Sequence, residues 1–303
     1  MQLLRKLCAI HATSGDEEPV KRFLLDYLEK HASSWKTQPV IHQGQGFQDC
    51  LVLAFGKPRT AVFAHMDSIG FTVRYGNELV KIGSPVCEDG FHLTGKDSFG
   101  AIECILKVKA KGSLSYEYNR LLDPGTTLTF SPLFKETTTR VQCCYLDNRL
   151  GIYNALKLAE TLTDGLLIFS CGEEHGGGSV GFLTNFMVEK YDVQQALISD
   201  ITWVTEGVKA GEGAAISLRD SGIPRRSFVK KIVDLAKKSD IPFQLEVEGA
   251  GGSDGTEIQH SPFAIDWCFI GAAEENVHSP FETVHKADID SMLKLYDMLM
   301  KKL

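Results

Sequence analysis

The chain has 303 residues, of which 43% are hydrophobic and 23% charged, and its formal net charge is -7. This composition is typical of a folded globular protein, and the length suggests one large domain or two unequal ones. The negative charge argues against nucleic acid and anionic membranes as partners. No apolar run approaches the roughly 18 residues that a membrane-spanning helix needs.

The first residues do not resemble an export signal. The apolar run of residues 7–10 is too short for the hydrophobic core of a signal peptide. The eight cysteines form no Cys-x-x-Cys motif, and several of them lie in apolar runs. Such cysteines are typical of buried thiols in a reducing compartment, so we expect a cytoplasmic protein.

The first part of the chain predicts a helix followed by two strands. Acidic residues follow Ser14, where a helix dipole favours them, and apolar residues then recur at helical spacing over residues 20–28. The apolar runs 51–55 and 60–64 are separated by the turn residues 56–58. We expect two neighbouring strands joined by that turn.

The pattern of apolar and turn-forming residues changes between residues 71 and 140. Short β-like segments alternate with Gly- and Pro-containing turns, and no helical pattern of convincing length occurs. The predicted strands are residues 79–82, 102–108, 114–118 and 128–130. We expect a small β-rich domain that is inserted into the first domain and exposes sheet edges.

After residue 140 helices and strands alternate. Helices are predicted at residues 148–162, 180–191, 226–239 and 286–303, and buried strands at 166–169, 196–198 and 267–270. This pattern indicates an α/β fold with a mostly parallel or mixed sheet and helices on both faces. Residues 1–70 and 141–303 would form this domain, and residues 71–140 would form the insert.

Polar side chains follow the predicted strands at one edge of this sheet, where open α/β sheets bind their ligands. A single Asp after a strand is usually a turn former or a helix cap, so each candidate alone is weak. Together, five apolar segments deliver acidic or imidazole side chains to this edge: His65 with Asp67, Asp147, Glu173 with Glu174, Asp200, and His278. Converging carboxylates repel one another unless a cation lies between them, so the pattern predicts a metal site.

Two spacings add chemical detail to this prediction. In an extended chain residues i and i+2 face the same side, so Asp67 can accept a hydrogen bond from the far ring nitrogen of His65 and orient that imidazole. Adjacent residues of an extended segment face opposite sides. One carboxylate of the Glu173-Glu174 pair can therefore bind metal while the other serves as a general base.

The order of these motifs resembles the glutamyl or deblocking aminopeptidases, also called the tetrahedral aminopeptidase family. The resemblance covers nearly the whole chain, and its motifs are specific in combination rather than singly. They are Thr13-Ser14-Gly15, Ala64-His65-Met66-Asp67, Leu146-Asp147-Asn148-Arg149, Glu173-Glu174, Asp200, the glycine-rich loop 251–255 and His278-Ser279-Pro280.

The resemblance implies two divalent metal ions, with zinc as the first choice and cobalt or manganese also compatible with nitrogen and oxygen ligands. One ion would be held by His65, Asp147 and Asp200. The other would be held by Asp147, Glu174 and His278, so that Asp147 bridges the two.

The resemblance further implies an aminopeptidase that hydrolyses the N-terminal residue from peptides with a metal-bridging water. Glu173 would be the general base, and Asp67 would support His65 as a second catalytic residue. The β-rich insert would mediate assembly into a homo-oligomer, from a dimer up to the twelve-subunit cage of the family.

The sequence departs from the family pattern at several places. His175-Gly176 follows the Glu pair where the family usually has Val-Gly, and we expect His175 to face solvent. The insert is short, which makes a dimer as compatible with it as the cage. His260 and His285 compete with His278 as the last ligand; we prefer His278, with His260 as the alternative.

Two other classes of function share this sequence pattern. A carboxypeptidase or an N-acyl amino-acid deacylase would use the same dinuclear centre with a different insert. A non-enzymatic binding protein would keep the fold without the chemistry, although the presence of every expected ligand and of the base argues against it.

Overall fold

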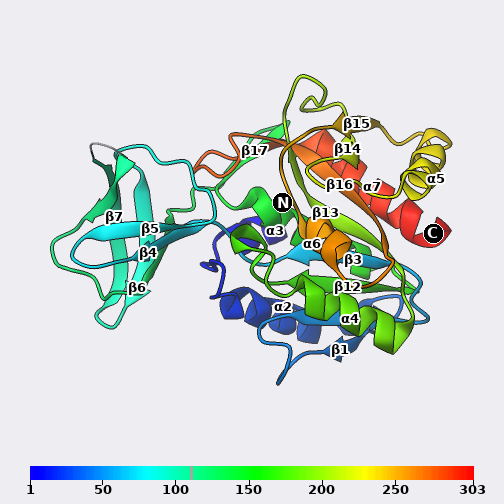
Figure 1. The fold of residues 1–303 in the computed structure, drawn as a ribbon, viewed down its shortest axis with the longest axis horizontal. Coiled ribbons are helices and arrows are strands. Elements are labelled where there is room, and N and C mark those ends of the chain that lie inside the picture. Colours follow the sequence, from blue (N-terminus) through cyan, green and yellow to red (C-terminus); the bar gives the residue numbers. More distant parts are fainter. Residues whose placement is uncertain (110–111) are drawn as a thin grey trace.

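The computed structural model describes residues 1–109 and 112–303. Figure 1 shows a large sheet with helices on both faces and a small β-barrel that projects from one end of the molecule. This architecture confirms the predicted fold class, an α/β unit with a small β-rich unit inserted into it.

The large sheet is mixed, with a parallel centre. Its strands in spatial order are β1 (Val40–His42), β2 (Leu51–Phe55), β12 (Gly165–Ser170), β3 (Ala61–His65), β13 (Gln195–Trp203), β16 (Asp266–Glu275), β17 (Thr283–His285), β11 (Arg140–Gln142) and β10 (Lys135–Glu136). Two further strands extend it, since β14 (Ala214–Arg219) pairs with β16 and β15 (Phe243–Val247) pairs with β14. The strands β12, β3, β13 and β16 run parallel, so their carboxyl ends meet at one edge.

The expected pairing of the first two apolar strands is wrong. Strand β12 lies between β2 and β3, antiparallel to β2 and parallel to β3. All five residues of β2 and of β3 are buried, so the apolar pattern shows that each strand is interior without showing which strand lies beside it. The short connection 56–60 therefore passes over the end of β12 instead of forming a hairpin.

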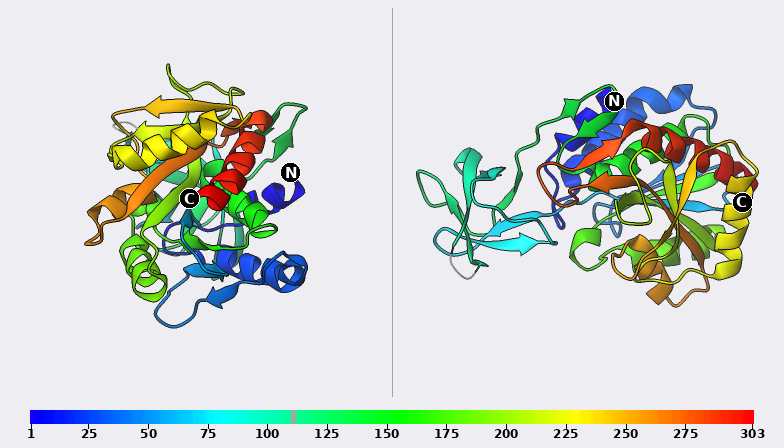
Figure 2. Two further views of the ribbon diagram at one scale, coloured as in Figure 1. Left: turned by 90° about the vertical axis from the view of Figure 1, so that its right-hand side faces the viewer. Right: turned by 90° about the horizontal axis from the view of Figure 1, so that it is seen from above.

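Helices cover both faces of the sheet, as Figure 2 shows. Helices α1 (Gln2–Cys8), α2 (Glu18–His31), α3 (Leu146–Ala159) and α7 (Lys286–Lys302) lie on one side, and α4 (Val180–Tyr191) and α6 (Asp254–His260) on the other, while α5 (Arg226–Lys237) packs against β14 and β16. Among the described residues no helix combines the length and apolar character that crossing a bilayer requires.

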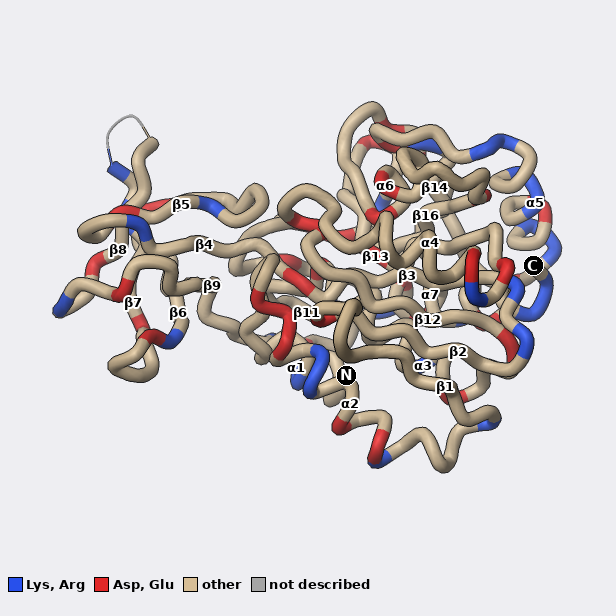
Figure 3. The backbone as a smooth tube through the Cα atoms, turned by 60° about the horizontal axis from the view of Figure 1, so that its bottom comes forward, with Lys and Arg blue, Asp and Glu red and all other residues tan. Residues whose placement is uncertain are grey.

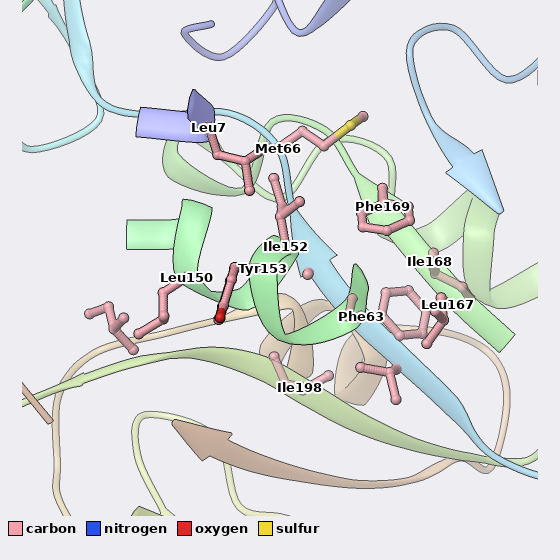
Figure 4. Packing of buried hydrophobic residues seen from close by; sticks show 14 of the residues in the cluster. Leu7, Phe63, Met66, Leu150, Ile152, Tyr153, Leu167, Ile168, Phe169 and Ile198 are labelled. Atoms are coloured by element: carbon pink, nitrogen blue, oxygen red, sulfur yellow. The ribbon is translucent and has the colours of Figure 1, made fainter. Parts of the chain in front are cut away.

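Helix α3 is the most deeply buried helix of the fold because it packs against β3, β13, α1 and α7. Figure 4 shows Ile152 and Tyr153 of α3 in one apolar cluster with Phe63 of β3 and Ile198 of β13. The sequence predicted this helix from residue 148. Its range starts at Leu146, but Asp147 and Asn148 have non-helical backbone angles, so the regular part of the helix begins after them, close to the predicted start. Residues 144–145 form a turn, so Asp147 follows a turn and precedes the regular part of the helix, and does not follow a strand.

The barrel consists of β4 (Gly70–Val73), β5 (Glu78–Ile82), β6 (His92–Asp97), β7 (Gly100–Val108), β8 (Leu114–Glu117) and β9 (Thr127–Phe130). These strands close on themselves, so the exposed sheet edges expected from the sequence do not occur among them. The assignment of residues 71–140 to a separate domain stays a prediction.

One buried arginine ties α3 to the chain that follows β3. Arg149 is fully buried, and its guanidinium donates hydrogen bonds to the main-chain oxygens of Ile10, Ala12, Met66 and Asp67. A buried charge is costly unless its hydrogen bonds are made. These contacts therefore fix the chain after β3, which carries Asp67, relative to the start of α3, which carries Asp147.

Candidate metal centre

The first group of predicted ligands meets at the carboxyl ends of β3 and β13. The Nε2 atom of His65 lies 3.1 Å from Oδ1 of Asp147 and 3.6 Å from Oδ2 of Asp200. His65 ends β3, Asp200 lies within β13, and all three side chains are buried. Each residue offers one ligand atom, and these atoms all lie within 4.8 Å of one another.

The second group shares Asp147 with the first. The Nε2 atom of His278 lies 3.3 Å from Oδ2 of Asp147 and 3.2 Å from Oε2 of Glu174. Asp147 thus faces His65 with one oxygen and His278 with the other, the arrangement that a bridging carboxylate needs. The structure brings together every residue that the sequence proposed as a metal ligand.

The two adjacent glutamates lie in a turn and not in an extended strand. Residues 173–175 form one turn of 3-10 helix, η3 (Glu173–His175), so the expected strand geometry is wrong. In this turn Glu174 joins the second group, whereas the Oε2 atom of Glu173 lies 3.8 Å from Nε2 of His65. The two carboxylates still point to different parts of the site, as the sequence predicted, but they do so because the backbone forms a helical turn there.

Asp67 lies behind the cluster and organises it. Its carboxylate accepts hydrogen bonds from the amides of Glu173 and Glu174, each at 3.1 Å, and from the hydroxyl of Ser14 at 2.6 Å. The Nδ1 atom of His65 lies 3.2 Å from the main-chain oxygen of Asp67 and 3.4 Å from its Oδ1. One buried aspartate therefore orients the imidazole and holds the glutamate turn, which fits the contact predicted for Asp67.

The cluster holds more negative charge than its own side chains can balance. Burial raises the pKa of Glu173 and of Asp200 well above the usual range of a carboxyl group. Burial opposes charge on His278 too, but hydrogen bonds to Asp147 and Glu174 raise the pKa of this imidazole to about 12. These shifts show that the carboxylates are unfavourable together in the charged form, and a cation between them would offset this cost.

The side chains present fit divalent metal ions. Each group supplies one imidazole nitrogen and two carboxylates, three protein ligands that leave a position open, as in catalytic zinc sites. The Oε1 atom of Glu174 is buried and has no hydrogen-bond partner among the described residues. An unpartnered buried carboxylate oxygen is unfavourable unless a cation satisfies it.

The other histidines that competed for the last position lie outside the cluster. His260 is exposed and lies 4.0 Å from Glu257, and His285 caps the start of α7. His175 is exposed, as expected, and its Nδ1 also accepts a hydrogen bond of 3.1 Å from the amide of Gly83. His278 is therefore the histidine that completes the second group.

Two supporting residues complete the surroundings of His278. Glu282, fully buried, accepts hydrogen bonds from the amides of His278 at 3.1 Å and of Asp147 at 3.4 Å. Ser84, from the connection between β5 and β6, has its Oγ 2.9 Å from Nδ1 of His278. Glu282 lies four residues after His278 in the sequence, whereas nothing in the sequence marks Ser84, which reaches the site only through the fold.

A cavity of about 350 Å³ opens in front of both groups. Figure 3 shows acidic segments crowded between the barrel and the sheet, whereas Lys and Arg residues lie mostly toward the outside, as around α5. The walls include Asp147, Glu173, Glu174, Asp200 and His278. Both groups are therefore open to a ligand of small-molecule or peptide size.

Known proteins are similar in sequence to most of this chain. The model of the M42 glutamyl aminopeptidase family matches residues 107–295. A putative aminopeptidase of Acetivibrio thermocellus is 25% identical over 97% of this chain and 96% of its own length.

Two solved structures share the fold. The TET1 peptidase of Pyrococcus horikoshii has a TM-score of 0.85 at 23% identity, covering 100% of this chain and 99% of that one. An aminopeptidase of Desulfurococcus kamchatkensis has a TM-score of 0.87 at 21% identity, covering 100% of this chain and 94% of that one.

Replacing Ser84 by Ala is expected to weaken one of two divalent-ion sites. The substitution removes the hydrogen bond at the outer ring nitrogen of His278, and loss of such a contact typically costs 10–100-fold in metal affinity. Calorimetric titration of metal-free protein with zinc would measure the change, with Ser227→Ala, an exposed residue of α5, as the matched control. Unchanged affinity at both sites in S84A would show that Ser84 does not orient the imidazole.

Proposed function

Since the chain belongs to the M42 glutamyl aminopeptidase family and is an aminopeptidase, we propose that it removes the N-terminal residue of peptides with two divalent metal ions. The shared carboxylate of Asp147, which faces both histidines, is the observation that carries the proposal. The family membership favours this activity over a carboxypeptidase or a deacylase, and over a binding protein without enzymatic activity.

The proposed ligands are His65, Asp147 and Asp200 for one ion, and Asp147, Glu174 and His278 for the other. Zinc suits these nitrogen and oxygen donors, as cobalt and manganese also do. When bound, such ions lower the pKa of a water shared between them and polarise the carbonyl of the scissile peptide bond.

Glu173 is the proposed general base. Its side chain lines the cavity and approaches His65, yet it belongs to neither ligand group. A carboxylate in this place can accept a proton from the attacking water and deliver it to the leaving amine. Asp67 is proposed to assist by holding the amide of Glu173 and the ring of His65, as its hydrogen bonds indicate.

We also propose that the chain forms a homo-oligomer, between a dimer and a dodecamer in size. The described strands of the barrel close on themselves and leave no edge among them to pair, but the barrel exposes large apolar side chains. Tyr75, Val80, Phe99 and Leu121 are 50–76% exposed. Exposed apolar side chains of this size favour association. The Pyrococcus horikoshii TET1 peptidase can assemble into a tetrahedron or a large octahedral shell.

A cytoplasmic location is proposed from the cysteines. All eight are free thiols in the structure, and seven of them are buried. A reducing compartment keeps such thiols unpaired. Fractionation of cells that produce the protein would test this location.

The two glutamates of η3 are expected to behave differently when each is changed to glutamine. Glu173→Gln should retain both ions and lose roughly 100-fold or more in kcat, the usual contribution of a general base. Glu174→Gln should instead lose metal from one site. Metal analysis together with turnover of aminoacyl reporter substrates would measure both effects, with Glu189→Gln on the exposed face of α4 as the control. The opposite pattern would reverse the two assignments.

The molar mass in solution tests the proposed assembly. Light scattering at micromolar concentration should give at least twice the 33.4 kDa of one chain. A single species of monomer mass would contradict the proposal, and the barrel would then act on the active site of its own chain, which it already reaches through Ser84.

A further inference from the structure

The cavity continues past the proposed metal ligands along one face of the sheet. Asp200 and Thr202 alternate along β13 and so face the same side, roughly 7 Å apart. Beyond the ligands, the cavity is lined by Thr202, Trp203, Asp220, Glu246, Glu248 and Phe269. If the carbonyl group of the substrate's N-terminal residue lay at the proposed metal centre, the side chain of that residue would lie in this extension.

The register of the sheet brings Glu246 to this extension from a different strand. Glu246 on β15 pairs with Ser217 on β14, and β14 in turn pairs with β16 beside β13. Its carboxylate accepts a hydrogen bond from the hydroxyl of Thr202. Glu246 is only 4% exposed, so its charge is held in the wall of the cavity and not in bulk solvent.

Three carboxylates of the extension have no lysine or arginine beside them in the described part of the cavity wall. The lining residues include Asp220, Glu246 and Glu248, and none of the described lining residues is Lys or Arg. The nearby Arg219 directs its guanidinium to the main-chain oxygens of Asp220 and Glu248. Metal ions would offset the carboxylates that bind them, but not these three.

A structural role explains the position of Asp220 and solvent exposure explains that of Glu248, but neither explains that of Glu246. Asp220 stabilises a turn, since its Oδ1 accepts a hydrogen bond of 2.6 Å from the amide of Gly222. Glu248 is partly exposed and solvated. Glu246 is buried, and among the described residues its carboxylate accepts a hydrogen bond from a hydroxyl and forms no ion pair, which is an unfavourable environment for a charge. A cationic ligand would remove this cost.

Resting on the aminopeptidase activity proposed above, we propose that Glu246 selects substrates with a cationic N-terminal residue, lysine or arginine. The cationic head of that residue pairs with Glu246, while Asp220 and Glu248 add to the negative potential of the wall. Its aliphatic stem packs beside Trp203 and Phe269, as long basic side chains do on apolar surface. An N-terminal glutamate is repelled, so this chain differs in preference from the glutamyl activity in the description of its family.

The proposal is tested with aminoacyl p-nitroanilides of lysine, norleucine and glutamate. Norleucine has the stem of lysine without the ammonium group, so the ratio of kcat/KM for lysine over norleucine isolates the charge. We expect a ratio of about 10 or more, because a hydrogen-bonded charge pair typically contributes this factor or a larger one, and we expect glutamate to be the poorest substrate. Calorimetry with free L-lysine and L-norleucine gives the same comparison without turnover.

Variants identify the residue responsible. Glu246→Gln should lower the lysine-to-norleucine ratio about tenfold, and Glu248→Gln, at a more exposed position, should lower it by a smaller factor. Glu206→Gln, on an exposed loop after β13, should leave the ratio unchanged. If E246Q does not fold, the E248Q variant and the wild-type ratios still decide the question.

Several results would overturn the proposal. A wild-type ratio of one or less would show that the extension does not select a cation. An equal loss on lysine and norleucine in E246Q would instead assign Glu246 to the substrate's α-amine. Failure to cleave any of the three substrates would refute the proposed aminopeptidase mechanism, and calorimetry with the free amino acids would still report on the extension separately.

Discussion

The carboxylate of Asp147 is the point on which the site depends, because each of its oxygens faces an imidazole from a different part of the chain. His65 comes from the end of β3, and His278 comes from the loop after β16. Two acidic side chains complete the groups on either side. Such convergence is unfavourable by electrostatics alone, so the fold must hold these groups in place and a cation must compensate them.

The fold provides this restraint with groups that belong to neither set of proposed ligands. Arg149 fixes the chain after β3 to α3 through main-chain oxygens, and Asp67 holds both the ring of His65 and the amides of the glutamate turn. Glu282 does the same for His278 and Asp147. The barrel takes part as well, because Ser84 contacts the outer nitrogen of His278. Contacts of the barrel with another subunit would therefore be linked through Ser84 to the position of His278.

Much of the site could be predicted because strand ends are visible in the sequence. Apolar runs followed by acids or histidines mark the edge of a parallel sheet, and the flanking residues Asn276 and Glu282, which fit the family pattern, favoured His278 over His260. The route of the chain between strands was less visible, since β2 and β3 are equally apolar and nothing in them indicates that β12 lies between.

Contacts that arise only through the fold could not be predicted. Asp147 follows a turn and not a strand, and both glutamates lie in a single 3-10 turn. Ser84 and Glu246 reach the cavity from distant segments with no local motif, because their positions depend on the closure of the barrel and on the pairing of β14 and β15.

The most direct test of this account is the number of metal ions that restores activity. Protein stripped by a chelator would be titrated with zinc while heat and turnover of an aminoacyl reporter are followed together. We expect two ions per chain, no turnover before metal is added, and a higher melting temperature for the loaded protein. Full turnover by metal-free protein, or saturation at one ion per chain with full activity, would contradict this expectation.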